Sequence, residues 1–457
     1  MNRIAARAFI VLVLVIALAG GLVFFFGDYL THGDEWIMFP GSPHVYNGNK
    51  VGAGTIVDRD STLLLDQTGE RTYSVDELLR RSSLHWVGDR PGNIRAVYVD
   101  HYAAALMGFD SINGVYTYGN NAGQLQLTLS AQLQNAALKA MGDKVGTVAV
   151  YNYETGELLC AVTTPTFDPE DPPVISDGNE GEYQGVYVNR FTQSKYIPGS
   201  IFKIVTLAAA LETVPGIQEK SFECTGEYEI GNGDVTCEDV HGTQTLKESF
   251  CNSCNCAFAQ IVEVMGADKL QRYVDLFGIT ESICFDGITT VSGNFDIEGA
   301  TAEELAWSGI GQHKDQVNPC AFLSFVGAIA NDGIMVSPYV VDSVSVGKQQ
   351  TYSADAENSG RVVSKATAQI LREFMQNNVQ TKYGAENFPG LTVCAKSGTG
   401  EVGGEKKPNA MFTGFVADSD YPLAFIAVVE DGGYGTRISM PIVSQVLSAC
   451  KSYMDGD

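Results

Sequence analysis

The sequence predicts a large α+β domain in its C-terminal part, preceded by a smaller mixed α/β domain and by one apolar helix. The length of 457 residues exceeds a single typical domain. Hydrophobic residues make up 45% of the chain and charged residues 18%, which is enough apolar material for a sizeable core. Strand-like segments stand at both ends of residues 146–457, with apolar helical stretches between them. This order favours an α+β domain whose sheet joins early and late strands.

The first element is an uncharged apolar run over residues 8–26, long enough to cross a bilayer as a helix. Arg3 and Arg7 precede this run and acidic residues follow it, so the positive-inside bias keeps the N-terminus in the cytoplasm. A cleaved signal peptide is the alternative, with residues 17–19 as an A-x-A-like cleavage site. Because the apolar run continues beyond that site, we favour a retained single-pass anchor. In either case the bulk of the chain lies outside the cytoplasm.

The chain therefore divides into three expected parts. Residues 1–27 form the cytoplasmic tail and the anchor, residues 28–145 the smaller N-terminal domain, and residues 146–457 the large domain. Residues 27–50, rich in Gly, Pro, His and Asn, are typical of a membrane-proximal linker. Polar and apolar residues alternate over residues 124–129, which predicts a strand, and a helix follows it.

The large domain opens with a predicted β-hairpin. Residues 146–153 form its first strand, residues 154–157 its turn and residues 158–162 its returning strand. Apolar helical stretches and further strands follow, and a last helix closes the chain. The helices are expected at residues 201–211, 258–265, 321–330 and 442–454, and the strands at residues 391–395, 412–416 and 423–429.

The charge balance excludes one class of partner. Asp and Glu number 54 against 29 Lys and Arg, a formal net charge of −25. A groove for nucleic acid needs a basic surface, so we expect no nucleic-acid partner.

The first candidate catalytic residues are Ser200 and Lys203, which follow a Pro-Gly break at the start of an apolar helix. Residues three apart lie on the same helix face, within side-chain reach of each other. A serine hydroxyl becomes a nucleophile when a neighbouring base takes its proton, and a lysine whose pKa is lowered by burial can be that base. The N-terminus of the helix adds a positive field and free N–H groups where an oxyanion would form.

Two further groups of polar residues accompany this pair. Ser253 and Asn255 stand just before a helix, where they could face a cleft or simply cap the helix. Residues 396–400, with the sequence Lys-Ser-Gly-Thr-Gly, directly follow an apolar strand. A cation, a hydroxyl and glycines at a strand edge would let a peptide backbone approach and pair with the strand. Each group alone is equally typical of an ordinary helix cap or turn.

Together the three groups match the S-x-x-K, S-x-N and K-[ST]-G set of penicillin-binding proteins and serine β-lactamases. The segments that flank the motifs distinguish between these families, and with them the chain resembles a class B penicillin-binding protein over most of its length after about Val51. The segments that carry this resemblance are residues 54–60, 189–203, 308–312, 328–333 and 412–415. The resemblance implies an antiparallel sheet flanked by helices in the large domain and a pedestal domain before it.

The resemblance also implies a role for each motif residue. Ser200 would attack the penultimate D-Ala carbonyl of a peptidoglycan stem peptide, and Lys203 would act as its base. Ser253 would relay the proton to the leaving amine, and Asn255 would hold the substrate amide and orient Lys203. The third motif would bind substrate. Lys396 would supply positive potential, and Ser397, Gly398 and Thr399 would form the strand edge. The oxyanion hole would consist of the Ser200 and Thr399 N–H groups.

The activity implied is that of a D,D-transpeptidase, which cross-links stem peptides and is trapped by β-lactams. The nearest alternatives are a D,D-carboxypeptidase or a β-lactamase on the same scaffold, and a non-catalytic cell-wall scaffold or β-lactam-binding protein is a third. A class A β-lactamase would need a Glu positioned to activate water, and no E-x-x-L-N segment lies between Asn255 and Lys396. No cofactor is expected. The partners implied are stem peptides, β-lactams, the bacterial membrane and a membrane glycan polymerase.

Ten cysteines suit disulfides in an oxidising compartment. Cys224 and Cys237 flank a segment that is typical of a hairpin loop, so we predict one disulfide between them. Cys251, Cys254 and Cys256 form a C-x-x-C-x-C segment beside the second motif. A structural zinc needs a fourth ligand, and none stands nearby in sequence, so we expect no metal site.

Overall fold

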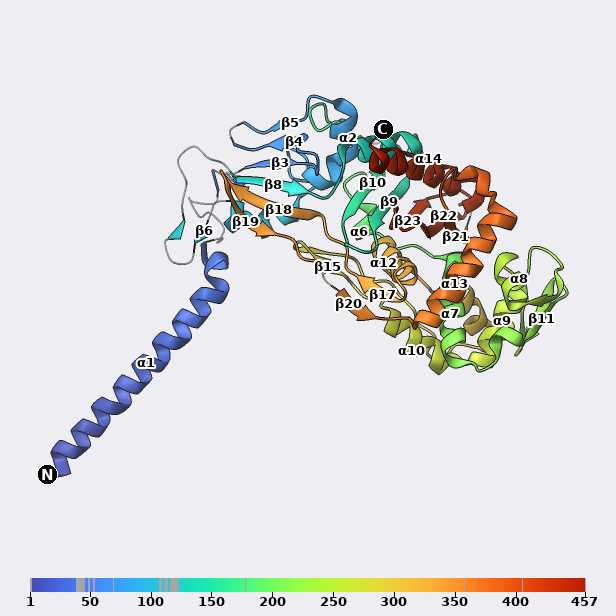
Figure 1. The fold of residues 1–457 in the computed structure, drawn as a ribbon, viewed down its shortest axis with the longest axis horizontal. Coiled ribbons are helices and arrows are strands. Elements are labelled where there is room, and N and C mark those ends of the chain that lie inside the picture. The colour runs from blue at the N-terminus through green and yellow to red at the C-terminus, as the bar shows by residue number, and fades with distance from the viewer. Residues whose placement is uncertain are drawn as a thin grey trace.

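The computed structural model describes residues 2–37, 46–47, 50–51, 54–68, 70–106, 109–110, 114–115, 123–176, 178–356, 358–404 and 406–456. Its most conspicuous element is helix α1 (Asn2–Ile37), which projects away from the folded body (Figure 1). Residues 3–33 form a helix long and apolar enough to span a membrane, and it is the only such helix among the described residues. The helix continues into the predicted linker, and residues 38–45 and 48–49 of that linker lie outside the described residues.

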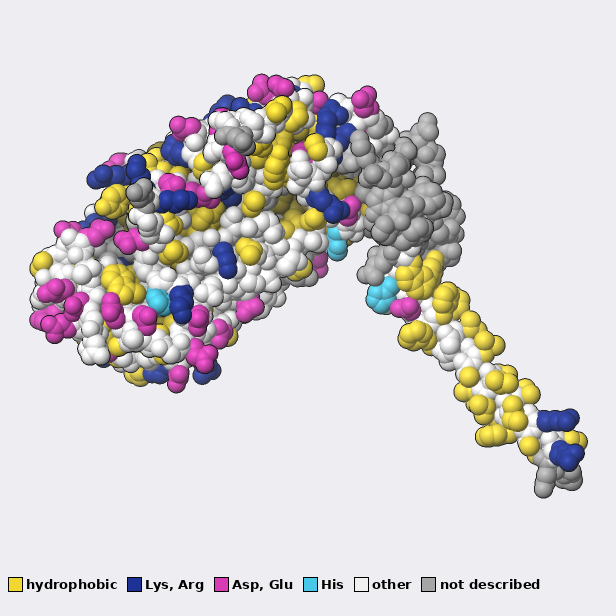
Figure 2. Space-filling model, turned by 180° about the vertical axis from the view of Figure 1, so that it is seen from behind, with side chains coloured by type: hydrophobic (Ala, Val, Ile, Leu, Met, Phe, Trp, Pro, Cys, Tyr) yellow, Lys and Arg dark blue, Asp and Glu magenta, His cyan; other side chains and the backbone are white. Residues whose placement is uncertain are grey.

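Hydrophobic side chains cover α1 along most of its length, and basic side chains lie at its N-terminal end (Figure 2). The exposed apolar residues run from Ile4 to Leu30, with phenylalanines among them. So many large apolar side chains would be unfavourable in water. Their exposure on α1 therefore agrees with burial of this helix in a bilayer.

The centre of the large domain is a five-stranded antiparallel sheet in the order β10-β9-β23-β22-β21. As predicted, early strands pair with late ones, because β9 (Gly146–Asn152) lies beside β23 (Leu423–Val429). The hairpin partner is β10 (Leu158–Thr164), and β22 (Asn409–Val416) and β21 (Val393–Gly400) complete the sheet. β21 is therefore an edge strand of this sheet.

Helices cover both faces of this sheet (Figure 1). α5 (Ala131–Met141) and α14 (Gly435–Asp455) pack on one face and share a buried apolar cluster with the strands. α12 (Pro319–Ala330) packs on the other face, against β22 and β23, and every residue of α12 is buried. A helix that is apolar all round has to be interior, and here it forms the centre of the domain core.

The remaining helices and strands of the large domain surround this layer, and several of them build the site described below. They are α6 (Arg190–Gln193), η1 (Gly199–Phe202), α7 (Lys203–Thr213), η2 (Ile217–Glu219), β11 (Ser221–Cys224), β12 (Glu227–Ile230), β13 (Gly233–Thr236), β14 (Gly242–Thr245), α8 (Leu246–Cys251), α9 (Asn255–Met265), α10 (Ala267–Phe277), β15 (Cys284–Phe285), β16 (Ile288–Thr289), α11 (Ala302–Ile310), β17 (Ile334–Val336), β20 (Asn358–Arg361), α13 (Lys365–Asn378), η3 (Val379–Tyr383) and η4 (Ala385–Asn387).

The N-terminal domain contains a second sheet of six strands in the order β19-β18-β8-β3-β4-β5. Its N-terminal strands are β3 (Thr55–Val57), β4 (Leu63–Asp66), β5 (Thr72–Tyr73) and β8 (Gly123–Leu127), the last of which matches the predicted strand. The same region holds α2 (Glu77–Val87), α3 (Val97–His101) and α4 (Ala103–Leu106), and the short pairs β1 (Tyr46–Asn47) with β2 (Lys50–Val51) and β6 (Phe109–Asp110) with β7 (Gly114–Val115).

Two strands of the six come from the other side of the expected domain boundary. β18 (Val341–Val346) pairs with β8, and β19 (Gln349–Ser353) pairs with β18. One sheet therefore contains strands from both sides of the expected boundary at residue 145/146. This exchange could not be predicted from the sequence, because pairing between remote strands leaves no local pattern.

The start of α5 is held by a residue far away in the sequence. Ser130 is the N-cap residue, but its hydroxyl makes no capping hydrogen bond. The Asp58 carboxylate instead accepts the Ala131 N–H at 2.8 Å. Asp58 thus caps a helix that packs against the five-stranded sheet, and a carboxylate is favourable at a helix N-terminus because of the helix dipole.

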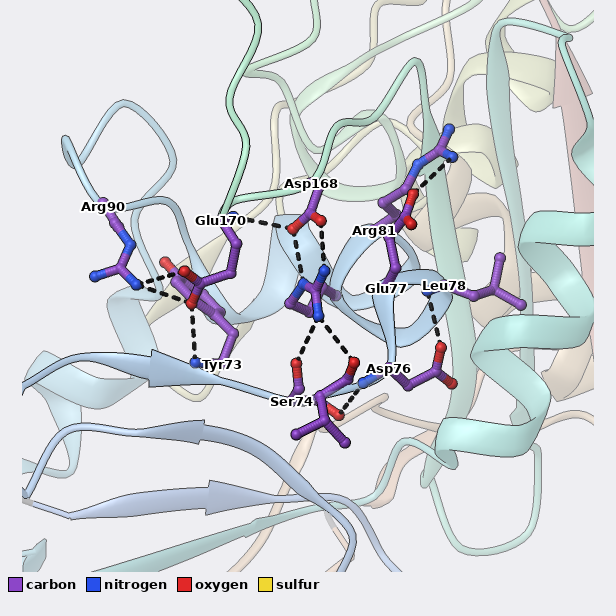
Figure 3. A network of polar contacts seen from close by, with 11 residues as sticks. Tyr73, Ser74, Asp76, Glu77, Leu78, Arg81, Arg90, Asp168 and Glu170 are labelled. Carbon is purple, nitrogen blue, oxygen red and sulfur yellow. Dashed lines mark hydrogen bonds and ion pairs between the residues drawn. The ribbon is translucent and has the colours of Figure 1, made fainter.

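A charged network also joins the N-terminal domain to the loop after β10 (Figure 3). Arg80, on α2, donates to both carboxylate oxygens of Asp168 at 2.8 and 2.5 Å, and to the carbonyls of Ser74 and Val75 at 3.0 Å. This pairing lowers the pKa of the Asp168 carboxyl. Beside it, Arg90 binds both carboxylate oxygens of Glu170 at 2.8 and 2.7 Å. Because Arg80 binds Asp168 through two of its nitrogens, this pair fixes orientation as well as distance and holds α2 against the loop after β10.

We expect Arg80→Ala to lower the free energy of unfolding by about 1 to 2 kcal/mol, since it removes charge-assisted hydrogen bonds at a partly buried contact. Arg95→Ala is the control, because the Arg95–Asp100 ion pair leaves 70% of the arginine side chain exposed and should contribute little. Urea unfolding of the full chain in detergent measures both. Equal stability of the two variants would contradict a structural role for the Arg80 contacts.

Candidate active site

Ser200 lies in the short 3₁₀ turn η1, immediately before α7, as the predicted helix start requires. The first residue of α7 is Lys203, and its Nζ lies 3.1 Å from the Ser200 Oγ. One turn of helix therefore places the candidate base within hydrogen-bond distance of the candidate nucleophile. Lys203 is fully buried, while Ser200 is half-buried.

A glycine before the serine lets the third motif approach this turn. Gly199 has φ +54°, a left-handed conformation that side chains disfavour. A Cβ at this position would lie 2.1 Å from the Thr399 carbonyl oxygen. The close contact between η1 and β21 thus depends on the absence of a side chain at position 199.

The second motif surrounds the ammonium group of Lys203. Lys203 Nζ donates to the Ser253 carbonyl oxygen at 2.6 Å and to Asn255 Oδ1 at 2.7 Å, and lies 3.3 Å from Ser253 Oγ. The ring of Phe258 lies beneath it, 5.5 Å away. Burial lowers the pKa of Lys203 to about 8, which brings its neutral, proton-accepting form within reach at ordinary pH.

Lys396 approaches the same serine from the third motif. Its Nζ lies 3.0 Å from Ser253 Oγ and 2.9 Å from the Ser397 carbonyl oxygen, and the side chain is fully buried. Burial, followed by the positive charge of Lys203, lowers the pKa of Lys396 well below its ordinary value. Ser253 Oγ therefore lies between two lysine amines, an arrangement through which a proton can pass.

Strand β21 presents the third motif at the edge of the sheet. It pairs residue by residue with β22 on one side, and its other side faces η1 and α13. The sequence suggested that Gly398 leaves room for a substrate, but the structure shows another need: a Cβ there would lie 2.8 Å from the Pro198 carbonyl oxygen. Gly398 thus permits close packing of β21 against the segment that carries Ser200.

Two residues that hold β21 had no predicted role. The Tyr383 hydroxyl, from η3, lies 3.0 Å from both the Ser397 Oγ and the Ser397 N–H. Gln312 donates to the Thr399 carbonyl oxygen at 3.1 Å. Gln312 lies in a segment that contributed to the family resemblance, whereas no pattern around Tyr383 distinguishes it from a core tyrosine.

The predicted disulfide is wrong in this structure: Cys224 and Cys237 are both free. The hairpin loop expected between them is a separate strand pair, β12 with β13, while Cys224 ends β11, whose partner is β14. Each of the two sulfurs instead contacts His241 Nδ1, at 3.5 and 3.6 Å. The cysteines are therefore arranged around a third group rather than bonded to each other.

Comparisons with known proteins give the family. Residues 146–448 match the model of the penicillin-binding protein transpeptidase domain. A peptidoglycan D,D-transpeptidase PbpA of Mycolicibacterium smegmatis is 30% identical over 359 residues, which cover 72% of each chain. The D,D-transpeptidase domain of a peptidoglycan glycosyltransferase from Eggerthella lenta is similar in structure, with a TM-score of 0.75, 28% identity and coverage of 88% of this chain and 99% of that one.

A more distant structure shows the same fold. The ceftriaxone acyl-enzyme complex of penicillin-binding protein A from Mycobacterium tuberculosis has a TM-score of 0.75 at 22% identity, covering 87% of this chain and 98% of that one. The family match extends over the catalytic sheet and all three motifs. This chain therefore belongs to the penicillin-binding protein transpeptidase family.

Proposed function

We propose that the chain is a peptidoglycan D,D-transpeptidase that acts through an acyl-enzyme on Ser200. The observation that carries the proposal is the continuous set of contacts from Ser200 Oγ to Lys203 Nζ, on to Ser253 Oγ and then to Lys396 Nζ. Such a set can take a proton from a nucleophile and return it to a leaving group.

In the acylation step, neutral Lys203 takes the proton of Ser200 as Oγ bonds to the penultimate D-Ala carbonyl carbon of a stem peptide. The carbonyl electron pair moves onto oxygen and returns as the C–N bond to the terminal D-Ala breaks. Ser253 gives its proton to the departing amine and receives one from Lys203. A second stem peptide then attacks the ester with its amine, and the same groups carry the proton in reverse.

The remaining roles concern substrate position. The Asn255 Oδ1 orients Lys203 and one Nδ2 hydrogen is donated to the Thr236 carbonyl at 2.9 Å, which leaves the second Nδ2 hydrogen to hold the substrate amide. The edge of β21 pairs with the substrate backbone through residues 397–399, and Thr399 binds the terminal carboxylate. Preorganised N–H groups of Ser200 and Thr399 stabilise the oxyanion. β-Lactams enter the same site as acyl donors.

The membrane arrangement and the partner polymerase belong to the same proposal. α1 anchors the chain with its N-terminus in the cytoplasm, since Arg3 and Arg7 stand at that end. The catalytic domain then lies outside the cytoplasm, beside its polymeric substrate. A membrane glycan polymerase supplies the strands that this transpeptidase cross-links.

The test separates transpeptidation from hydrolysis on the same scaffold. Among the described residues, no carboxylate lies within hydrogen-bond distance of Ser200, Lys203 or Ser253, so deacylating water has no dedicated base. With a peptide or thioester donor and a D-amino acid, the full chain in detergent should form more amide than free acid, as measured by mass spectrometry. A product that is mainly acid would indicate a carboxypeptidase, and rapid turnover of penicillin a β-lactamase.

A further inference from the structure

Beside the catalytic residues lies a cluster of four soft ligands that no step of the reaction uses. It consists of Cys224, Cys237, His241 and Cys254, whose ligand atoms all lie within 4.8 Å of one another. Cys224 and Cys254 are buried and the other two are half-buried. The sequence spacing did not predict this set, because its members come from four places: the end of β11, the residue after β13, the residue before β14, and the N-cap of α9.

The distances match a tetrahedral zinc site. Zinc bonds of about 2.3 Å to sulfur and about 2.0 Å to nitrogen, at tetrahedral angles, separate two sulfurs by about 3.8 Å and a sulfur from a nitrogen by about 3.5 Å. Cys224 Sγ and Cys237 Sγ lie 3.5 and 3.6 Å from His241 Nδ1, and Cys237 Sγ lies 3.9 Å from Cys254 Sγ. These three separations are thus close to edges of the tetrahedron, and the other three pairs of ligand atoms lie within 4.8 Å.

From these contacts we infer that Cys224, Cys237, His241 and Cys254 bind one structural Zn²⁺ ion, which fixes the second catalytic motif in place. Three thiolates and one imidazole form a closed Cys₃His set, the kind that binds zinc without leaving a position for substrate. The Ala257 N–H also donates to Cys254 Sγ at 3.4 Å, as outer hydrogen bonds do for metal thiolates.

The local fold explains why a metal is needed here. β11 with β14 and β12 with β13 form separate two-stranded sheets; a few side chains such as Phe222 and Val235 face the domain core, while more than half of the strand residues are exposed. A two-stranded sheet with so small a buried face is only marginally stable by itself, so a cross-link would stabilise it. A zinc ion bound by residues at the ends of β11, β13 and β14 joins both sheets to α9.

The link to catalysis runs through Cys254, which stands between Ser253 and Asn255. Ser253 has φ +54°, an unfavourable conformation for a residue other than glycine. Its carbonyl oxygen and the Asn255 side chain both accept from Lys203, so the peptide around Cys254 determines where Lys203 lies. Asn255 also donates to Thr236, the residue before Cys237. Metal bonds to Cys254 and Cys237 therefore fix the backbone beside Asn255 and the backbone beside Thr236.

Metal content of the full chain, purified in detergent, tests the site directly and independently of the proposed acyl transfer. Wild type should contain about one zinc per chain, and Co²⁺ exchanged into it should give the thiolate charge-transfer and visible bands of tetrahedral cobalt. Cys237→Ser and His241→Ala should lose most of the metal, whereas Cys284→Ser, which replaces an exposed thiol outside the cluster, should retain it. Three results would overturn the proposal. The wild type could lack zinc even after growth with added zinc, both ligand variants could keep their zinc, or Cys237 and Cys254 could form a disulfide.

The catalytic consequence rests on the proposed function and is measured separately. Removing the ion with a chelator should slow acylation of Ser200 by fluorescent penicillin by about ten- to a hundredfold, because a misplacement of about 1 Å in a catalytic site can cost about 10²-fold in rate, and added Zn²⁺ should restore the rate. Circular dichroism before and after chelation distinguishes loss of position from loss of fold. If the chain binds zinc but its removal does not change the acylation rate, the metal site is confirmed and its role in positioning the second motif is wrong.

Discussion

Replacing Ser200 with alanine is expected to abolish covalent labelling by β-lactams. The side chain that forms the ester is then absent, and Lys203, the nearest amine, is fully buried. In wild type, intact mass spectrometry should show addition of the whole β-lactam, because ring opening releases no fragment, and peptide mapping should place it on Ser200. Transpeptidation should fall to background in the same variant.

Ser452→Ala is the matched control, since it removes an exposed hydroxyl on α14. It should label at the wild-type rate. Labelling that persists in Ser200→Ala at the wild-type stoichiometry would mean that another residue is the nucleophile, and the assignment of all three motifs would then have to be revised.

The second large effect concerns Lys203. Methionine has a similar length but cannot accept a proton, so Lys203→Met should slow acylation by about 10² to 10⁴, the range for loss of a general base. In wild type, the acylation rate should rise with pH up to about pH 8 and level off above it, because burial lowers the pKa of Lys203 to about 8 and only the neutral amine is a base.

The pH profile distinguishes this role from a structural one. Lys203→Met should lose the rise below pH 8 together with the rate, while Lys348→Met, at an exposed position after β18, should keep both. A slow variant that retained the wild-type profile would assign the titration to another group, and Lys396, whose amine also lies close to Ser253 Oγ, would be the first to examine.

Much of this site could be predicted because its chemistry is local in sequence. Ser200 and Lys203 lie one helical turn apart, and Ser253 and Asn255 flank one residue, so residue type and spacing largely determine their geometry. The β9–β10 hairpin and the long apolar helices were predicted for the same reason, since periodicity within one element reports its buried face.

What sequence could not predict depends on contacts between remote segments. Tyr383 supports β21 from a different helical segment, and the pairing of β18 with β8 crosses the domain boundary. The four cysteine and histidine ligands are the sharpest example. Their neighbours in sequence suggested a disulfide between two of them and no metal, because the nesting of one strand pair inside another has no sequence signature.

The pairing of β8 with β18 has a consequence for how the chain folds as it is synthesised. β8 leaves the ribosome early, but its neighbour β18 follows only about 200 residues later along the chain. Until then the edge of β8 that pairs with β18 stays unpaired. Contacts between such distant segments form slowly and expose strand edges in the meantime. The six-stranded sheet therefore does not fold first and by itself. It is completed only when β18 and β19 have been made, so it and the five-stranded sheet acquire their final structure together.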